Sequence, residues 1–407
     1  MRKSPKLLIL TPALASAVAL GLTACSDGSD DAAASSAKPV EERKATPRLA
    51  LTHDGGVDVL DGTSLSDVDD VPVEGFTRVN DAGDGRHVFV STSNGFELLD
   101  LGAWSEAHGD HSHHYSSEPR LTGTTYDADK PGHVVLHDGR TTLFDDGTGK
   151  VRILDSAKIG EDGSLIDEFS VPAHHGVAVA RADGSVVVSK GDEDTRTGLV
   201  IRDAQGATVA QSDECPGLHG EAGAADGVLT FGCEDGVLIV RGTEISKVKA
   251  DAPYARIGNQ RGGDGSPITL GDYKTDKGNE HEHPQQFSLI DTTAKTIRVV
   301  PTGGWSYSFR SLGRGKNGEA LILGTDGALH VFDPASGQEI RTVPLIGAWS
   351  EPDDWQEPMP SLYVQGDTAY IDEPSSKRLI AVSLDDYRTL TETKTAAPGN
   401  ELAGVTG

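Results

Sequence analysis

The segment His87-Val-Phe-Val-Ser-Thr-Ser-Asn-Gly-Phe-Glu-Leu-Leu-Asp100 decides the fold class. Residues that favour strands occupy His87–Ser91 and Phe96–Leu99, and the pair Asn94-Gly95 separates them. β-Branched and aromatic residues favour extended backbone, and Asn-Gly between two such runs is typical of a tight hairpin. The segment therefore predicts two antiparallel β-strands.

Pairs of this kind recur from residue 48 onward, and no long helical periodicity interrupts them. The other pairs are Arg48–His53 with Val57–Leu60, Val134–Leu136 with Thr141–Phe144, Val177–Ala180 with Ser185–Ser189, Val228–Phe231 with Val237–Val240, Ile268–Leu270 with Phe287–Ile290, Ala320–Leu323 with Leu329–Phe332, and Thr368–Ile371 with Leu379–Val382. The units repeat at roughly forty to fifty residues, which is the period of propeller blades. The chain is therefore predicted to be all-β, with a β-propeller over residues 48–407.

The connectors and the chain ends predict the number of blades. Gly102-Ala103-Trp104-Ser105-Glu106 recurs as Gly347-Ala348-Trp349-Ser350-Glu351, so one connector type is reused between units. Innermost strands are expected to start near Phe76, His133, His175, His219, Arg256, Phe309 and Leu362. Residues Glu401–Gly407 would add one more strand beside the hairpin at 48–60. We expect eight blades closed by strands from both termini, with seven as the alternative.

The N-terminus has the pattern of an export signal. Arg2, Lys3 and Lys6 precede an apolar run, and residues 1–24 fit a secretory signal peptide. The ending Leu22-Thr23-Ala24-Cys25 resembles a bacterial lipobox, in which Cys25 would be acylated and become the mature N-terminus. The composition of residues 25–47 predicts a disordered tether. We therefore expect a protein anchored by lipid to the extracytoplasmic face of the cell membrane.

The remaining cysteines and the net charge limit the function classes. Apart from Cys25 the chain contains only Cys215 and Cys233, and an exported pair is expected to form a disulfide. A thiolate metal site is disfavoured because Cys-x-x-Cys spacing is absent. The formal net charge of −27 repels phosphate backbones, so no nucleic-acid partner is expected. We expect a monomer.

One polar segment has the composition of a metal site. It gathers four imidazoles and a carboxylate within a few positions, at His108, Asp110, His111, His113 and His114. Imidazole with carboxylate suits Zn²⁺, Ni²⁺ or Cu²⁺. Copper is disfavoured because Met-rich segments are absent, whereas nickel stays an alternative to zinc. The other interpretation of this loop is a solvated polar connector.

Three further histidines occupy equivalent positions in the predicted propeller. His133, His175 and His219 lie where three consecutive innermost strands begin, and these strands line the central channel. Three imidazoles from neighbouring blades would meet at one mouth of the channel and could hold zinc. His174 competes with His175, because a shift of one residue turns a side chain to the other face of a strand.

The connector 103–131 leads into the strand of His133, so the His108–His114 loop is expected at the same mouth of the channel. Zinc prefers four ligands. Glu221, Asp110 or water are the candidates for the fourth.

The chain resembles the AztD family of periplasmic zinc metallochaperones, which are encoded with a zinc ABC importer. The segments Gly102–Tyr115, Pro131–Gly139 and Leu143–Gly149 carry the resemblance. It implies a β-propeller that binds zinc and passes it to the solute-binding protein of the importer. It also implies one zinc site in the propeller and a second in a flexible His-rich segment. The residues that match the His-rich segment are His108, Asp110, His111, His113 and His114, and those carried onto the propeller site are His133, His175 and His219. The predicted lipid anchor departs from the freely diffusing form of the family.

Catalytic motifs do not point to an enzyme. The sequence contains no Gly-x-Ser-x-Gly elbow, no His-Glu-x-x-His and no phosphate-binding loop. A propeller can still build an active site from scattered residues. The alternatives to a zinc carrier are therefore a metal- or quinone-dependent oxidoreductase or lyase, and a non-catalytic adhesion or scaffold lipoprotein.

Overall fold

The computed structural model describes residues 38–263, 265–279 and 281–407. The predicted signal peptide, Cys25 and the first part of the predicted tether lie outside the described residues. Within them the chain consists of strands, turns and four 3-10 helices of three residues each. None of these helices has the length and the apolar character needed to cross a lipid bilayer.

The described strands form eight four-stranded antiparallel sheets, here called blades, and one three-stranded sheet. The first four blades, each given from its innermost strand outward, are β35 (Leu402–Val405), β2 (Arg48–His53), β3 (Gly56–Asp61) and β4 (Asp67–Pro72); β5 (Arg78–Asp81), β6 (His87–Thr92), β7 (Gly95–Asp100) and β10 (Arg120–Asp127); β11 (Pro131–His137), β12 (Arg140–Asp145), β13 (Lys150–Asp155) and β14 (Leu165–Ser170); and β15 (Ala178–Ala180), β16 (Val186–Gly191), β17 (Arg196–Arg202) and β18 (Thr208–Ser212).

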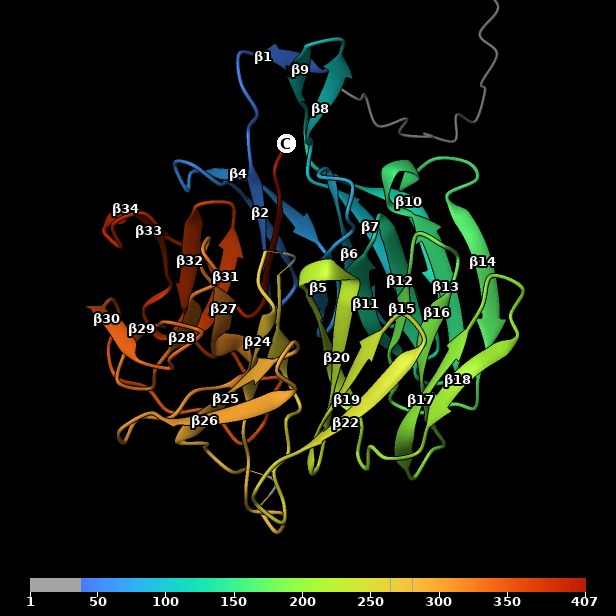
Figure 1. Cartoon of the computed structure of the whole chain (residues 1–407). Coiled ribbons are helices and arrows are strands. Elements are labelled where there is room, and N and C mark those ends of the chain that lie inside the picture. Colours follow the sequence, from blue (N-terminus) through green and yellow to red (C-terminus); the bar gives the residue numbers. More distant parts are fainter. Residues whose placement is uncertain (1–37, 264, 280) are drawn as a thin grey trace, which may run out of the picture. The chain divides into compact units, whose positions relative to one another are not determined.

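The other four blades are β19 (His219–Ala224), β20 (Val228–Cys233), β21 (Gly236–Arg241) and β22 (Glu244–Lys249); β23 (Gln260–Arg261), β24 (Ile268–Asp272), β25 (Gln286–Asp291) and β26 (Thr296–Pro301); β27 (Leu312–Arg314), β28 (Ala320–Leu323), β29 (Ala328–Phe332) and β30 (Glu339–Pro344); and β31 (Ser361–Gln365), β32 (Thr368–Glu373), β33 (Arg378–Ser383) and β34 (Thr389–Lys394). Figure 1 shows these sheets side by side.

Neighbouring blades follow one another around a ring. Strand β35 lies beside β5, β11 beside β15, β19 beside β23, β23 beside β27, β27 beside β31, and β31 beside β35 again. Apolar side chains fill the space between blades, for example Val59 against Val79 and Val88 on one side, and Val179 with Phe231 on the other. This packing removes the facing apolar surfaces of neighbouring blades from water. The predicted β-propeller is confirmed.

Both ends of the described chain contribute to one blade. Strand β35 pairs with β2, with Arg48 opposite Val405 and Leu51 opposite Leu402. The sheet therefore joins the first residues of the propeller to its last ones. This confirms the expectation that Glu401–Gly407 adds a strand beside the hairpin at 48–60. Such closure removes two strand edges that would otherwise be unpaired.

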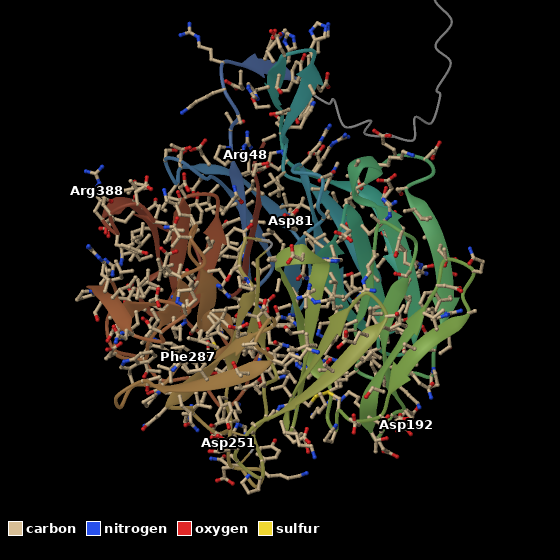
Figure 2. All side chains as sticks on the ribbon, in the orientation of Figure 1. Arg48, Asp81, Asp192, Asp251, Phe287 and Arg388 are labelled. Carbon is tan, nitrogen blue, oxygen red and sulfur yellow. A yellow bond between two sulfur atoms is a disulfide. The ribbon has the colours of Figure 1, made fainter. Side chains whose placement is uncertain are left out.

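Each blade has two ends, and the strand directions define them. We call the end at which the innermost strands begin the start face, and the opposite end the end face. In an antiparallel blade the turn between the second and third strands lies on the start face, whereas the turn between the third and fourth lies on the end face. Asp192, directly after β16, and Asp251, two residues after β22, mark the start face at the lower edge of Figure 2.

A small sheet projects from the other end of the molecule and contains the His-rich segment. Its strands are β8 (Ala103–His108), β9 (His111–Ser116) and β1 (Val40–Glu42), and we call this sheet the flap. The β8–β9 hairpin is inserted between β7 and β10 of one blade, and it stands at the top of Figure 1. Strand β1 comes from the segment predicted as a tether; it pairs with the edge of β9, with Glu41 opposite Tyr115.

Candidate metal centre

Three histidines from three consecutive blades meet at the central channel. His133 lies in β11, His175 in the loop before β15 and His219 at the start of β19. One ring nitrogen from each lies within 4.8 Å of the others. The ring centroids are 5.0 Å apart for His133 and His175, and 4.9 Å apart for His175 and His219. The predicted convergence of these residues, here called the channel triad, is therefore present in the structure.

The hydrogen bonds of two triad members fix which nitrogen carries the proton. Nδ1 of His175 lies 2.5 Å from Oδ2 of Asp146, and Nδ1 of His219 lies 2.5 Å from the carbonyl oxygen of Gly258. Both partners are acceptors, so both Nδ1 atoms donate. In the neutral rings each Nε2 then presents a lone pair, and these two atoms are only 2.9 Å apart. Two facing lone pairs repel, unless a proton or a metal cation lies between them.

Metal-binding histidines in proteins usually donate their other nitrogen to a carboxylate or a backbone carbonyl. Asp146 and Gly258 supply one of each kind. In a tetrahedral zinc site with bonds near 2.0–2.1 Å, neighbouring nitrogens are about 3.3–3.4 Å apart. The observed 2.9 Å is about 0.4 Å shorter than that spacing. The donor set of the channel triad therefore fits zinc.

Local backbone features aim these side chains. The pairing of β11 with β12 shifts between Pro131 and Val134, and that of β19 with β20 shifts between His219 and Glu221. Such bulges redirect a side chain at the end of a strand. Gly220 has φ +69, and a Cβ there would lie 2.3 Å from the carbonyl oxygen of Gly258. A glycine is therefore required where the β19 backbone passes the acceptor of His219.

Burial keeps two of the imidazoles neutral. Burial, together with the charge of the neighbouring His175, lowers the pKa of His133 to about 4. Burial also lowers the pKa of His219 well below its ordinary value, with His133 and His175 acting in the same direction. Both rings are uncharged near neutral pH, which is the form that binds a metal.

The channel triad lines a cavity of about 620 Å³. Glu221 lines the same cavity, and burial raises its pKa to about 7 although Arg261 acts against this. The carboxylate of Glu221 does not belong to the group of converging ligand atoms found among the described residues. Arg310 and Arg78, also at this cavity, both pair with Glu401. Water thus fits the fourth zinc position better than a protein carboxylate.

His174 has a structural environment instead. Its Nε2 lies 2.8 Å from Oγ of Ser189, and its Nδ1 lies 2.7 Å from the carbonyl oxygen of Pro172. His174 is 3% exposed as a residue, and its ring packs against Phe144. Between the two neighbouring candidates, the structure brings His175 into the channel triad.

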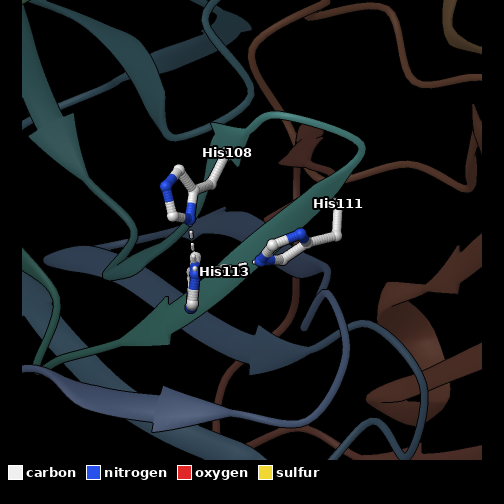
Figure 3. Close-up of side chains that lie close together, drawn as sticks. All are labelled: His108, His111 and His113. Carbon is white, nitrogen blue, oxygen red and sulfur yellow. Dashed lines mark hydrogen bonds between the residues drawn. The ribbon is translucent and has the colours of Figure 1, made fainter.

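The flap brings together a second group of imidazoles. His108, His111 and His113 each have a ring nitrogen within 4.8 Å of the others (Figure 3). Nε2 of His113 lies 3.3 Å from Nδ1 of His108 and 3.3 Å from Nε2 of His111. Glu41 of β1 lies 2.8 Å from Nδ1 of His113, so this nitrogen donates and Nε2 faces the other rings. We call these residues the flap cluster.

Two other residues of the His-rich segment lie outside the flap cluster. Nδ1 of His114 lies 2.7 Å from Oγ of Ser105, which in turn donates to the carbonyl oxygen of Gly407. Asp110 lies at the tip of the hairpin, with Oδ1 3.2 Å from Nδ1 of His111. Asp110 therefore supports a cluster histidine, whereas His114 contacts Ser105, which joins the flap to Gly407.

The two histidine groups lie on opposite faces, so the expectation that they share one mouth of the channel is wrong. The flap is inserted between the third and fourth strands of its blade, which places it on the end face. The channel triad lies where innermost strands begin, on the start face. Strand β10 lies within the predicted connector 103–131 and completes the blade after the flap. Asp110 therefore cannot supply a fourth ligand to the triad.

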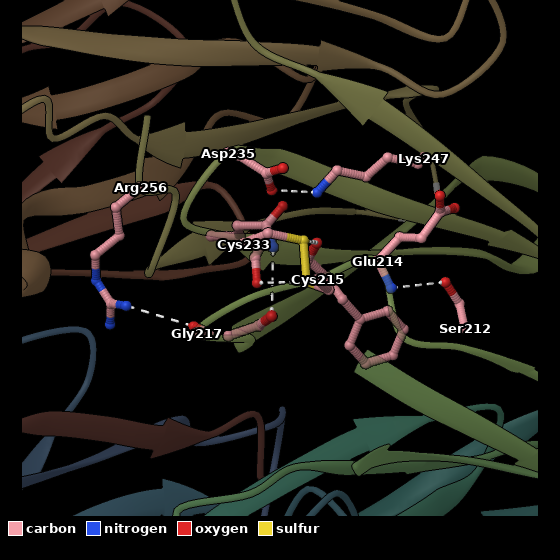
Figure 4. Close-up of a disulfide and its surroundings, with 12 residues drawn as sticks. Ser212, Glu214, Cys215, Gly217, Cys233, Asp235, Lys247 and Arg256 are labelled. Atoms are coloured by element: carbon pink, nitrogen blue, oxygen red, sulfur yellow. Dashed lines mark hydrogen bonds and ion pairs between the residues drawn. A yellow bond between two sulfur atoms is a disulfide. The ribbon is translucent and has the colours of Figure 1, made fainter. Parts of the chain in front are cut away.

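A disulfide anchors the segment that leads to His219. Cys215 and Cys233 are bonded, as predicted (Figure 4). Cys233 ends β20, in which Gly232 lies opposite His219. Both cysteines are buried in the apolar core between the β15–β18 blade and the β19–β22 blade. The cross-link therefore limits the movement of residues 215–219 relative to the channel.

Orienting residues were not identified as such from the sequence. Asp146 follows β12 in a turn between second and third strands, so the topology that located the histidines also places it on the start face. Gly258 acts through its backbone carbonyl and gives no side-chain signal. Glu41 lies in a segment whose composition predicts a tether.

Comparisons with known proteins found a curated relative and solved structures of similar fold. No family model matches the chain. The zinc chaperone AztD of Citrobacter koseri is 25% identical over 366 residues, which cover 86% of this chain and 83% of that protein. Its crystal structure aligns with a TM-score of 0.74 and 22% identity over 89% of this chain and 99% of that one, and the apo structure aligns equally well over all of its chain.

A more distant solved structure, dihydro-heme d1 dehydrogenase NirN, aligns with a TM-score of 0.55 and 12% identity over 90% of this chain and 76% of that one. That likeness concerns the fold alone. The name of the Citrobacter koseri relative describes a chaperone and not an enzyme, in agreement with the expectation of a non-catalytic protein. The chain is thus similar in sequence and in fold to the zinc chaperone AztD.

Proposed function

We propose that this protein is an extracytoplasmic zinc chaperone that carries zinc in the channel triad. One observation carries the proposal: the Nε2 atoms of His175 and His219 face each other at 2.9 Å while both Nδ1 atoms donate elsewhere. A neutral pair in this arrangement lacks a shared proton, and a zinc ion coordinated by both nitrogens would remove the repulsion. His133 supplies the third nitrogen.

The rigid blades hold the three imidazoles in place before zinc arrives. His133 and His219 come from strands of two separate blades and His175 from the loop before β15, so three different segments hold the three ligands. The Asp146 carboxylate beside His175 offsets part of the charge of the bound cation. A preorganised ligand set spends little conformational entropy on binding.

Zinc release follows from unequal exposure of the ligands. The side chain of His175 is 46% exposed, whereas His133 and His219 lie deeper in the channel wall. A receiving protein can therefore replace His175 and the water ligand first and take over zinc through a shared intermediate. We propose that the receiver is the solute-binding protein of a zinc ABC importer, because the related AztD is a zinc chaperone.

The flap cluster has a separate role in this proposal. His108, His111 and His113 lie on the end face, and the histidine side chains at the hairpin tip are exposed, with His111 57% accessible. An exposed cluster of this kind exchanges zinc quickly with its surroundings. We propose that it captures zinc independently of the channel triad rather than covering it as a lid.

The proposed location is the extracytoplasmic face of the cell membrane, with the protein held by a lipid on Cys25. The lipobox-like order Leu22-Thr23-Ala24-Cys25 supports this placement. Cys25→Ser should release the protein into the soluble extracytoplasmic fraction, while the wild type stays with membranes. Equal amounts of both proteins in the soluble fraction would contradict the anchor.

A transfer assay tests the chaperone function. The zinc-loaded protein is mixed with an apo zinc-importer solute-binding protein in the presence of a strong chelator that traps free zinc. Direct transfer predicts that the receiver gains zinc despite the chelator. The His175→Ala/His219→Ala variant should transfer none. The matched control His281→Ala changes an exposed histidine outside the triad and should transfer normally. Zinc found only on the chelator would contradict the proposal.

A further inference from the structure

A third group of metal-binding atoms lies outside both histidine clusters, in the blade that joins the two ends of the chain. His53 ends β2, Asp58 lies in β3 and Asp70 in β4. One ligand atom from each residue lies within 4.8 Å of the others. Asp58 and Asp70 are directly opposite each other on adjacent strands.

Hydrogen bonding again fixes the proton of the imidazole. Nδ1 of His53 lies 3.0 Å from the carbonyl oxygen of Asp54, which only accepts, so Nδ1 donates. Nε2 then carries the lone pair of the neutral ring. It lies 3.1 Å from Oδ1 of Asp70 and 3.7 Å from Oδ1 of Asp58. These spacings bracket the ligand-to-ligand distance of about 3.3–3.5 Å in a tetrahedral zinc site.

The charge of this group is poorly compensated. The side chain of Asp58 is 13% exposed, and within the described residues its carboxylate accepts no hydrogen bond. Burial raises the pKa of Asp58, and the charges of Asp70 and Asp67 raise it further against the effect of His53. Like charges directly opposite on neighbouring strands destabilise a sheet.

A different histidine of the same protein shows what a simple ion pair looks like. Nδ1 of His330 lies 2.6 Å from Oε1 of Glu339, and its Nε2 lies 3.1 Å from Oδ1 of Asp326. One carboxylate faces each nitrogen, so a protonated ring satisfies both. At His53 both carboxylates face the same nitrogen, and a single N–H there would reach only one of them.

We propose that His53, Asp58 and Asp70 bind a divalent transition-metal cation, with Zn²⁺ as the natural occupant. One imidazole and two carboxylates are a ligand set used by zinc and by other first-row divalent ions. The Asp70 side chain is 60% exposed, which leaves an open side for water ligands. The bound cation would join β2, β3 and β4 within the blade that closes the ring. This site is independent of the proposed chaperone function.

The test uses crystals of the protein equilibrated with excess zinc chloride near pH 8, where protons compete little with the metal at imidazole. Anomalous difference maps at the zinc edge should show a peak between His53, Asp58 and Asp70. Metal analysis after dialysis should show that Asp70→Asn, at an exposed position, lowers bound zinc by one ion per chain and removes this peak. Asp326→Asn, at the His330 ion pair, is the matched control and should leave the peak unchanged.

The result that would overturn the inference is the lack of a peak at His53, or a peak of full occupancy in Asp70→Asn. A peak at His53 without one at the channel triad would support this site and contradict the proposed function. The two conclusions can therefore fail separately.

Discussion

Oδ2 of Asp146 lies 2.5 Å from Nδ1 of His175, although the two residues are 29 positions apart and belong to neighbouring blades. Oδ1 of the same carboxylate accepts the backbone N–H of Gly176. Asp146 thus fixes both the proton and the position of the His175 ring. The carboxylate is part of the metal centre although it does not reach the metal position itself.

Asp146→Asn should therefore weaken zinc binding at the channel triad by about 10- to 100-fold, since loss of an orienting carboxylate costs that much in other metal sites. Competition with a chromogenic chelator measures the affinity. Asp110→Asn removes a carboxylate beside a flap histidine and should leave the triad affinity unchanged. Equal triad affinities for Asp146→Asn and the wild type would contradict the orienting role.

The flap and the channel triad should bind zinc independently, because they lie on opposite faces of the propeller. His111→Ala/His113→Ala should lower the number of zinc ions bound and leave the affinity of the triad unchanged. Isothermal titration calorimetry separates the two binding events. Loss of triad affinity in this variant would mean that the flap completes the triad site.

The disulfide should stabilise both the fold and the zinc site. Cys215→Ser/Cys233→Ser removes a cross-link between residues 18 positions apart, which costs about 3 kcal/mol in the chain-entropy model. Because residues 215–219 lead directly to His219, zinc affinity should fall together with the melting temperature. Thermal unfolding and chelator competition measure the two effects. A lower melting temperature with unchanged zinc affinity would separate the disulfide from the site.

Two aspartates at the ends of second strands should make the stability of the fold depend on pH in opposite directions. Burial raises the pKa of Asp372 to about 8, although Arg310 acts against this. The folded protein then keeps a proton that the unfolded chain releases above about pH 4, so stability falls as pH rises from about 4 to 8, by at most about 1.4 kcal/mol per pH unit. Asparagine does not titrate, so the stability of Asp372→Asn should not show this fall. The difference in stability between the variant and the wild type should therefore shift in favour of the variant as pH rises.

Asp145 is the matched position in the β11 blade. Burial acts to raise its pKa, but hydrogen bonds from Thr148 and from backbone N–H groups outweigh it and lower the pKa. A carboxyl group whose pKa is lower in the folded state stabilises the fold at neutral pH. This stabilisation is lost as pH falls. Asp145→Asn should therefore destabilise the protein at neutral pH. Chemical denaturation at several pH values measures the free energy of unfolding of both variants. If this free energy changed with pH in parallel for Asp372→Asn and the wild type, the raised pKa of Asp372 would be contradicted.

Much of the fold could be predicted from local patterns. Turn pairs such as Asn94-Gly95 and Asp54-Gly55 mark the hairpins, and short apolar runs mark the strands between them. The repeat of these units was enough to place His133, His175 and His219 at equivalent positions, and the structure brings them together. Topology alone thus located a centre built from three distant segments.

The face of the propeller on which the flap lies could not be predicted, because the strand that determines it, β10, has a weak apolar pattern. Strand β10 reads Arg-Leu-Thr-Gly-Thr-Thr-Tyr-Asp, is largely accessible to water and carries no apolar stripe. An outermost strand packs on one partner only and needs few apolar residues, so it resembles a connector. If β10 is not recognised, the sequence leads from the His-rich insertion directly into β11 rather than back into its own blade.

The central claim is that His133, His175 and His219 hold zinc through one nitrogen each. Crystals of the protein loaded with a single equivalent of zinc, measured at the zinc absorption edge, test it most directly. The account predicts one dominant anomalous peak about 2.0–2.1 Å from the ring nitrogens of all three residues. A dominant peak elsewhere, with none between these three rings, would contradict it.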